Sequence, residues 1–270
     1  MKRISLIAAV LFCAMAANAQ QRVLAHRGGR GDFEENVMET FRQSNAAGMH
    51  AFEMDVRITA DGYLVISHDG NMKRMYGEDC IIEETDLSDL RALRTEHGNQ
   101  IPTLDEFLDF LKDKKDLYVE FEMKTDEKYY PAEKLAGYCD LVYDKVMSAK
   151  PADALYILSS FDYRALRYLT VHHPGEDCFM LIHGDPINDK TIALAMSLGV
   201  KRMACWLNGT SRARVKEAHD KGMKVNLWPG GGIEDFVLAY SLGADYICTD
   251  YPVELMDFAK KNSDWINVKF

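Results

Sequence analysis

The feature that most constrains the fold of this chain is a repeated junction at which a helical stretch ends in glycine and a short apolar run follows. The junction occurs at Ala47-Gly48-Met49, Leu198-Gly199-Val200, Lys221-Gly222-Met223 and Leu242-Gly243-Ala244. Glycine readily adopts the left-handed conformation that ends a helix, so each junction predicts a helix followed by a strand. Because parallel strands need crossover helices, this repeated unit predicts a parallel α/β sheet.

Eight apolar runs of strand length predict the strands of this sheet. They are Arg22–His26, Ala51–Val56, Leu117–Met123, Leu155–Ser159, Cys178–Ile182, Arg202–Trp206, Lys224–Trp228 and Tyr246–Thr249. Segments of helical period follow most of them, as at Met38–Ala47, Ala132–Met147 and Arg212–Lys221. Eight strands in about 250 residues favour a closed TIM-type (βα)₈ barrel over an open doubly wound sheet.

The stretch from about residue 68 to 102 predicts a short insertion after the second barrel strand. About sixty residues separate the second and third strands, which is more than one helix and its loops require. Leu87–Leu93 and Leu104–Leu111 predict two short helices, and Leu64–Ser67 predicts an additional strand beside the barrel mouth. We expect this insertion to help shape a pocket.

The first nineteen residues predict a secretory signal peptide. Met1-Lys2-Arg3 is basic, Ile4–Ala17 is almost wholly apolar, and Ala17-Asn18-Ala19 has the small-x-small pattern of a cleavage site. The alternative is a membrane anchor, but about fourteen apolar residues are fewer than the roughly 20 that a span needs. We therefore expect removal of residues 1–19, export to the periplasm without stable membrane insertion, and one barrel domain over residues 20–270.

The net charge argues against a nucleic acid partner, and the cysteine content argues against disulfide or zinc-ribbon frameworks. The formal net charge is −10, from 32 Lys and Arg against 42 Asp and Glu, and such a field repels nucleic acid phosphates. After loss of Cys13, five cysteines remain, with no Cys-x-x-Cys pair. This pattern predicts neither a disulfide framework nor a zinc ribbon, and it favours buried thiols at Cys178, Cys205 and Cys248.

Acidic residues cluster on two predicted neighbouring strands. Glu53 and Asp55 lie two apart on one strand, as do Glu122 and Lys124 on the next, so each pair projects to one side of the sheet. Active sites of (βα)₈ barrels form at the carboxyl ends of the strands. Three carboxylates converging there would repel one another unless a cation lay among them, and oxygen ligands suit Mg²⁺ or Ca²⁺.

Ion pairing offers an alternative explanation of these acids. Arg27, Arg57 or Lys124 could neutralise them in salt bridges at the barrel rim. Glu120 shares the same face one layer deeper, so it is either a paired structural acid or a rival ligand.

Two histidines at predicted strand ends suggest acid–base chemistry. Imidazole titrates near neutrality, and His26 and His68 are each followed by a charged residue, Arg27 and Asp69. A lone histidine is more often structural. Arg27 offers a bidentate fork for phosphate oxygens and Lys124 a point charge. Together, a cation, two histidines, an arginine and a lysine are suited to cleaving a phosphate ester.

These residues belong to a longer ordered series. In chain order it comprises His26-Arg27-Gly28-Gly29, Glu35-Asn36, Thr40-Phe41, Gly48, Glu53-x-Asp55-Val56, Thr59-x-Asp61-Gly62, His68-Asp69, Arg74, Ile101-Pro102-Thr103-Leu104, Glu122-x-Lys124, Ser159-Ser160-Phe161-Asp162 and Thr249-Asp250-Tyr251-Pro252. The series, which extends from Leu24 to about Pro252, closely resembles the bacterial glycerophosphodiester phosphodiesterase family.

The resemblance implies a TIM-type barrel with a small insertion after the second strand. It implies hydrolysis of a small-molecule glycerophosphodiester to glycerol 3-phosphate and a free alcohol, with one divalent cation, Mg²⁺ or Ca²⁺. The residues implied are Glu53, Asp55 and Glu122 for the metal, His26 and His68 for acid–base catalysis, and Arg27 and Lys124 for the phosphate.

Two segments depart from the family pattern. Glu34-Glu35-Asn36-Val37 stands where the family usually has Pro-Glu-Asn-Thr, and Trp228 is followed by Pro229-Gly230-Gly231-Gly232 rather than by Thr, an apolar residue and Asn. We expect Trp228 to bind substrate as an apolar wall, the alternative being a core-packing aromatic.

Two other functions stay open from the sequence. A lipid phosphodiesterase on the same barrel would need an apolar lip for acyl chains. A cell-envelope binding protein with a decayed site would fail to cleave any phosphodiester in the presence of metal.

Overall fold

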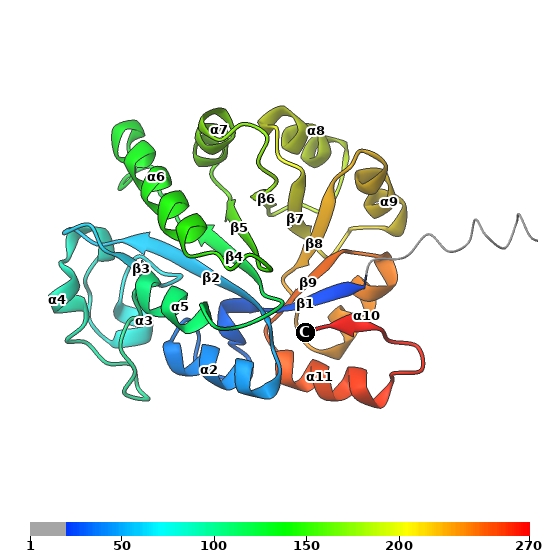
Figure 1. The fold of residues 1–270 in the computed structure, drawn as a ribbon, viewed down its shortest axis with the longest axis horizontal. Coiled ribbons are helices and arrows are strands. Elements are labelled where there is room, and N and C mark those ends of the chain that lie inside the picture. The colour runs from blue at the N-terminus through cyan, green and yellow to red at the C-terminus, as the bar shows by residue number, and fades with distance from the viewer. Residues whose placement is uncertain (1–19) are drawn as a thin grey trace, which may run out of the picture.

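The computed structural model describes residues 20–270, which form a closed barrel of parallel strands surrounded by helices (Figure 1). The predicted signal peptide, residues 1–19, lies outside the described residues.

The chain alternates between strands and helices over most of its length. The strands are β1 (Gln21–Ala25), β2 (Ala51–Ile58), β3 (Leu64–Ile66), β4 (Tyr118–Met123), β5 (Leu155–Ser160), β6 (Phe179–His183), β7 (Arg202–Trp206), β8 (Lys224–Trp228), β9 (Tyr246–Thr249) and β10 (Val268–Lys269). The helices are η1 (His26–Gly28), α2 (Met38–Ala47), α3 (Lys73–Tyr76), η2 (Ile82–Glu84), α4 (Leu87–Leu90), α5 (Leu104–Leu111), α6 (Ala132–Ser148), α7 (Tyr163–His172), α8 (Asp189–Leu198), α9 (Arg212–Asp220), α10 (Ile233–Leu242) and α11 (Pro252–Lys261).

The barrel consists of the eight predicted strands, in the order β1-β2-β4-β5-β6-β7-β8-β9. It closes because β1 pairs on both sides: Ala25 is the register partner of Phe52 in β2 and of Thr249 in β9. All eight strands run parallel, so their carboxyl ends meet at one rim. The predicted TIM-type barrel is therefore confirmed.

The four junction glycines adopt the conformation that the sequence predicts. Their φ angles are 118° at Gly48, 74° at Gly199, 79° at Gly222 and 86° at Gly243. Because a side chain at positive φ is strained, glycine at these positions allows each helix to end and the next strand to begin within a few residues.

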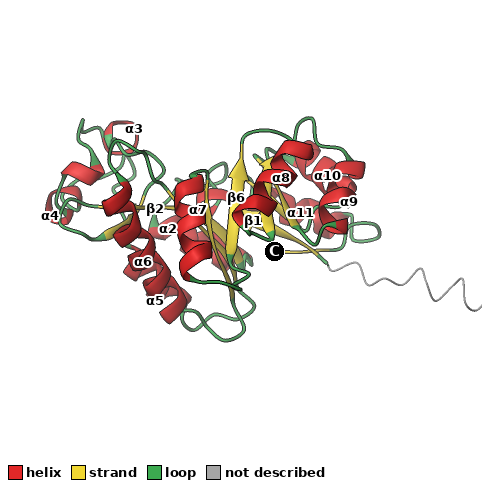
Figure 2. Cartoon of the chain, turned by 90° about the horizontal axis from the view of Figure 1, so that it is seen from above, coloured by secondary structure: helices red, strands yellow, loops and turns green. Residues whose placement is uncertain are grey.

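The segment between β2 and β4 contains β3 and four short helices. β3 extends the sheet by pairing antiparallel with the outer end of β2. The predicted helix at Leu87–Leu93 is shorter than expected and ends at Leu90, because the following residues form turns with hydrogen bonds to residues three earlier. A small separate core holds the segment together, and Figures 1 and 2 place α3 and α4 at one end of the molecule, away from α8–α10.

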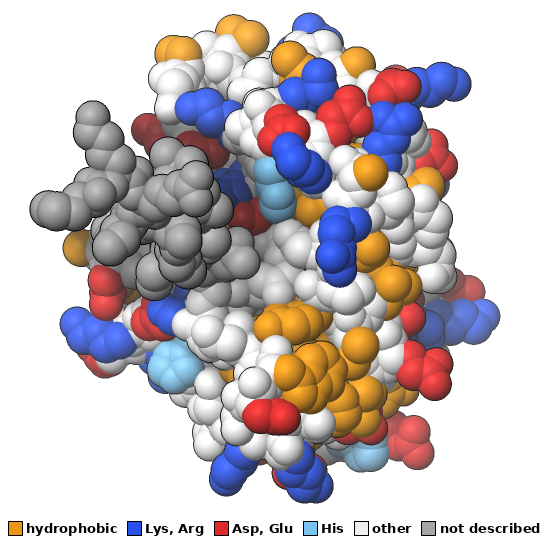
Figure 3. Space-filling view, turned by 90° about the vertical axis from the view of Figure 1, so that its right-hand side faces the viewer, with side chains coloured by type: hydrophobic (Ala, Val, Ile, Leu, Met, Phe, Trp, Pro, Cys, Tyr) orange, Lys and Arg blue, Asp and Glu red, His pale blue; other side chains and the backbone are white. Residues whose placement is uncertain are grey.

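The remaining apolar side chains form two layers. One cluster fills the barrel interior, and a larger one lies between the strands and the surrounding helices. Cys178, Cys205 and Cys248 are buried free thiols, as predicted. On the face shown in Figure 3, basic side chains are interspersed with acidic ones. Among residues 20–270, no helix combines the length and apolar character needed to cross a membrane.

Candidate active site

Three buried carboxylates converge where β2 and β4 end at the barrel mouth. Glu53 and Asp55 come from β2, and the strand register places Asp55 beside Glu122 of β4. Carboxylate oxygens of the three residues lie within 4.8 Å of one another. Glu53 Oε1 is buried and has no hydrogen-bond partner among the described residues. An oxygen-only donor set with such a free oxygen fits Mg²⁺ or Ca²⁺.

The electrostatics of the cluster favour an additional positive charge. Burial, together with the charges of Asp55 and Glu122, raises the pKa of Glu53 well above its usual value. Burial likewise raises the pKa of Glu122. Burial also disfavours the charged form of Asp55, but the charges of Lys124 and Arg27 outweigh this effect and lower its pKa. A cation would relieve the repulsion that remains.

Two basic side chains accompany the carboxylates. Lys124 Nζ lies 3.0 Å from Asp55 Oδ1 and also contacts Glu122, while Arg27 Nε lies 3.6 Å from Asp55 Oδ2. The ion pairs considered from the sequence therefore exist beside the candidate metal site. Arg57 is the exception, since it pairs at 2.8 Å with a carboxylate outside the cluster. Arg27 and Lys124 thus lie where they can reach a phosphate bound at the carboxylates.

A tight turn after β1 places Arg27 in this position. Arg27, Gly28 and Gly29 have φ angles of 50°, 82° and 109°. A Cβ atom at Gly28 would lie 2.9 Å from a side-chain carbon of Thr40, so a larger residue does not fit. The turn directs the backbone N–H of Arg27 to Glu53 Oε2, at 2.9 Å. Local backbone geometry therefore connects β1 to the carboxylate cluster.

His26 is paired with an aspartate from the far end of the sequence. Its Nδ1 lies 2.5 Å from Asp250 Oδ1, which also accepts a hydrogen bond from Arg30 Nε at 2.8 Å. Its other ring nitrogen, Nε2, lies 3.8 Å from Glu53 Oε2. Burial lowers the pKa of His26, and Asp250 acts against this effect. With Nδ1 donating to Asp250, Nε2 of the neutral ring is free to accept a proton.

His68 has an aspartate partner of its own. Its Nδ1 lies 2.8 Å from Asp69 Oδ1, and its backbone carbonyl accepts hydrogen bonds from Arg57 Nε and Nη2 at 3.1 and 2.8 Å. Burial lowers the pKa of His68 as well. The side chain of His68 is 34% exposed, whereas that of His26 is 14% exposed. His68 is thus the more accessible of the two histidines.

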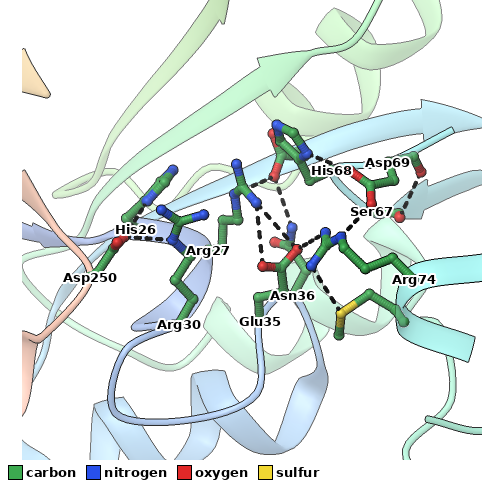
Figure 4. A network of polar contacts seen from close by, with 12 residues as sticks. His26, Arg27, Arg30, Glu35, Asn36, Ser67, His68, Asp69, Arg74 and Asp250 are labelled. Atoms are coloured by element: carbon green, nitrogen blue, oxygen red, sulfur yellow. Dashed lines mark hydrogen bonds and ion pairs between the residues drawn. The ribbon is translucent and has the colours of Figure 1, made fainter. Parts of the chain in front are cut away.

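Further polar residues connect these groups (Figure 4). Asn36 Nδ2 donates to Asp55 Oδ2 at 2.8 Å. Arg74 donates to Glu35 and to Asp69, both at 2.5 Å. The motif series contains Glu35, Asn36, Asp69 and Arg74, but the sequence assigned these four residues no role. Their order in the chain was visible, whereas the partner of each depends on the folded barrel.

Glu120 has a complete set of partners of its own. The Tyr118 hydroxyl donates to Glu120 Oε1 at 2.7 Å, and Asn226 Nδ2 lies 2.9 Å from both carboxylate oxygens. Burial raises the pKa of Glu120 to about 7. Of the two possibilities left by the sequence, the structure favours a paired acid below the site over a rival ligand.

Trp228 belongs to an aromatic cluster at the barrel rim. Its ring centroid lies 5.4 Å from that of Phe161 and 5.2 Å from that of Trp206, both in edge-to-face geometry. These residues follow or end β5, β7 and β8, whereas the charged groups of the site lie on or shortly after β1, β2, β3, β4 and β9. Trp228 is only partly buried, so it packs against neighbours and also contributes to the rim surface. The rim is therefore polar on one part and aromatic on another.

Comparison with known proteins relates this arrangement to one family. A sequence model of the glycerophosphoryl diester phosphodiesterase family matches residues 26–254. The chain is 26% identical over 248 residues to a glycerophosphodiester phosphodiesterase of Caldanaerobacter subterraneus subsp. tengcongensis, covering 88% of this chain and 98% of that protein. It is 28% identical over 272 residues to human lysophospholipase D GDPD1, covering 87% and 85%.

A solved structure shares the fold. It is an Oleispira antarctica phosphodiesterase in complex with the product sn-glycerol-3-phosphate. The TM-score is 0.78 with 23% sequence identity, and the match covers 89% of this chain and 97% of that chain.

Proposed function

The chain belongs to the glycerophosphoryl diester phosphodiesterase family, and we propose that it hydrolyses glycerophosphodiesters to glycerol 3-phosphate and a free alcohol, using a divalent cation and two histidines. The observation that carries this proposal is the placement of two aspartate-paired histidines beside three converging carboxylates. The names and structures of the relatives support the reaction class.

Glu53, Asp55 and Glu122 would hold the cation, as Mg²⁺ or Ca²⁺. When bound there, the cation supplies Lewis-acid stabilisation of a phosphoryl oxygen. Lys124 and Arg27 lie within ion-pair distance of the same carboxylates, so they can neutralise the charge that builds on the phosphoryl group.

His26 is the general base in this proposal. Asp250 keeps the proton on Nδ1, and Nε2 removes a proton from the attacking oxygen. The attacker is water, or the glycerol 2-hydroxyl, in which case water subsequently opens the cyclic phosphate. A bond forms between phosphorus and the attacking oxygen as the bond to the alcohol oxygen breaks.

His68 is the general acid. It transfers the Nε2 proton to the leaving alkoxide, while Asp69 accepts a hydrogen bond from Nδ1 and stabilises the protonated ring. The greater exposure of His68 supports this assignment, because the alcohol must leave through the open side of the site.

The test is release of glycerol 3-phosphate from glycerophosphocholine. We expect a chelator to abolish it and added Mg²⁺ or Ca²⁺ to restore it. Glu53→Gln should lower turnover with either cation present, since one of three ligands is lost. Asp245→Asn, which changes a largely buried carboxylate paired with Lys224 outside the site, is the control and should retain turnover. Turnover that survives both the chelator and Glu53→Gln would exclude the metal assignment.

A second candidate is cleavage of a lipid phosphodiester by the same groups. The observation in its favour is the aromatic part of the rim, formed by Phe161, Trp206 and Trp228, which could contact an acyl chain. A matched relative is named lysophospholipase D. Hydrolysis of intact phospholipid or lysophosphatidylcholine, without hydrolysis of deacylated glycerophosphocholine, would favour this candidate. Failure to cleave any phosphodiester with metal present would instead favour a binding protein.

We also propose that the protein is bacterial and exported to the periplasm after loss of residues 1–19. The basic start, the apolar run Ile4–Ala17 and the motif Ala17-Asn18-Ala19 support this proposal. Amino-terminal sequencing of the protein from a periplasmic fraction should give a chain that begins at Gln20. Recovery of the full-length chain from the membrane fraction would contradict it.

A further inference from the structure

Arg74 connects the segment between β2 and β4 to two carboxylates of the site (Figure 4). Its Nε donates to Asp69 Oδ2 and its Nη2 to Glu35 Oε1, each at 2.5 Å. Asp69 uses its other oxygen, Oδ1, for His68. Glu35 also accepts a hydrogen bond from Arg27 Nη1, at 3.2 Å. A continuous chain of charged hydrogen bonds therefore runs from the buried interior to the more exposed histidine.

The exposure of these side chains increases from Glu35 to Asp69 and Arg74. The side chain of Glu35 is 9% exposed, that of Asp69 is 29% exposed and that of Arg74 is 48% exposed. A buried carboxylate held by two guanidinium groups is a firm anchor, whereas a partly exposed aspartate can rotate toward water. Arg74 joins the two carboxylates, because one of its nitrogens donates to the anchored Glu35 and another donates to Asp69.

We propose that Arg74 is a positioning residue for His68. Anchored on Glu35, it fixes the carboxylate of Asp69, and Asp69 in turn fixes the ring orientation and protonated nitrogen of His68. The inference rests on the proposed function, in which His68 protonates the leaving alcohol. Arg74 itself contacts neither the carboxylate cluster nor the reacting atoms in this scheme.

The consequence is a dependence on the leaving group. Choline leaves as a poor alkoxide and needs a proton, whereas p-nitrophenolate leaves readily without one. Misplacing a catalytic group by about 1 Å costs on the order of 10²-fold, so Arg74→Gln should lower kcat for glycerophosphocholine by about 10- to 100-fold. The loss should be about threefold or less for a p-nitrophenyl ester of glycerol phosphate, because general acid catalysis contributes little there.

Arg91→Gln is the matched control. Arg91 lies in the same segment and forms an ion pair of similar length with Glu106 of α5, at 2.6 Å; within residues 20–270 its side-chain partners are Glu106 and the Ile101 carbonyl, neither of which belongs to the site. It should change kcat for both substrates by less than about threefold. Arg74→Lys should recover only part of the loss, since an ammonium group is a point charge and does not reproduce the guanidinium fork. Urea unfolding of each variant monitors the fold.

A double variant tests the route through Asp69. If Arg74 acts on His68 by this route, Arg74→Gln should add less than about twofold to the loss already caused by Asp69→Asn. Independent losses that multiply would overturn the inference. So would equal losses on the two substrates, or an Arg74→Gln variant that behaves like Arg91→Gln. A wild-type protein that cleaves neither substrate would instead refute the proposed function.

Discussion

Replacing Asp250 with asparagine tests whether the carboxylate of Asp250 assists proton transfer by His26. Asp250 Oδ1 lies 2.5 Å from His26 Nδ1, and the two side chains are 16% and 14% exposed. When His26 accepts a proton, a positive ring forms beside a fixed negative carboxylate. Asparagine keeps the shape of the side chain but removes that charge.

The structure sets the size of the expected effect. Two unit charges about 4 Å apart attract by about 4 kcal/mol at an effective dielectric constant of 20. Arg30 already shares the same oxygen, at 2.8 Å, so part of the charge of Asp250 is neutralised before the reaction begins. About 2–3 kcal/mol then remains to stabilise the protonated ring, which corresponds to a loss in kcat of about 30- to 150-fold.

The assay measures glycerol 3-phosphate released from glycerophosphocholine with Mg²⁺ present. We expect Asp250→Asn to lower kcat with little change in KM, because the interaction strengthens only as the proton is transferred. Asp32→Asn is the control, since Asp32 lies in the loop between η1 and α2, away from His26 in its bonding, and accepts its hydrogen bond from the backbone N–H of Val253, at 2.8 Å. A kcat for Asp250→Asn within threefold of wild type, or a change confined to KM, would refute the reasoning.

Three further predictions concern stability and substrate binding. Burial alone would raise the pKa of Asp245, but hydrogen bonds from His219 and Lys224 outweigh burial and hold the pKa below its usual value. The stability that these hydrogen bonds contribute is present above the pKa of the unfolded chain, about 3.9, and is lost as pH falls through the lower pKa of the folded protein. In urea unfolding, Asp245→Asn should therefore cost about 1–3 kcal/mol at pH 7 and distinctly less at pH 3, and an equal cost at both would be inconsistent with this. Phe107→Ala should lower the free energy of unfolding by about 3–5 kcal/mol, because its buried ring contacts three other buried phenylalanines; a cost below about 1 kcal/mol would contradict that packing. Trp228→Ala should raise KM about 3- to 10-fold with kcat retained, as expected when about 1 kcal/mol of apolar contact is lost, and an unchanged KM would assign the ring to packing alone.

The sequence predicted the strands and most helices well because their signals are local. The predicted bounds of β7, β8 and β9 coincide with those observed, as do those of α2 and α5. An apolar run, a helical period and a glycine at a helix end act over a few residues, so their effect does not depend on distant parts of the chain. The prediction was less accurate at Leu87–Leu93, where turns replace the end of the expected helix.

The candidate metal ligands could also be anticipated locally. The spacing of Glu53 and Asp55 on one strand, and the position of Glu122 on the next, already placed three acids on one face. The structure brings their oxygens within 4.8 Å of one another. What spacing could not reveal is which acids are already paired, and Glu120 differs from Glu122 through partners on other parts of the sheet.

The pairing of side chains was decided by closure of the barrel. His26 and Asp250 are 224 positions apart in the chain, yet they meet because β1 lies beside β9. Arg74 and Glu35 are 39 positions apart, and they meet because β1 also lies beside β2, which leads into the segment that contains Arg74. The sequence by itself determined the elements and the kinds of chemical group at the strand ends. Only the closed sheet, which fixes the neighbours of every strand and their register, decided which of those groups touch.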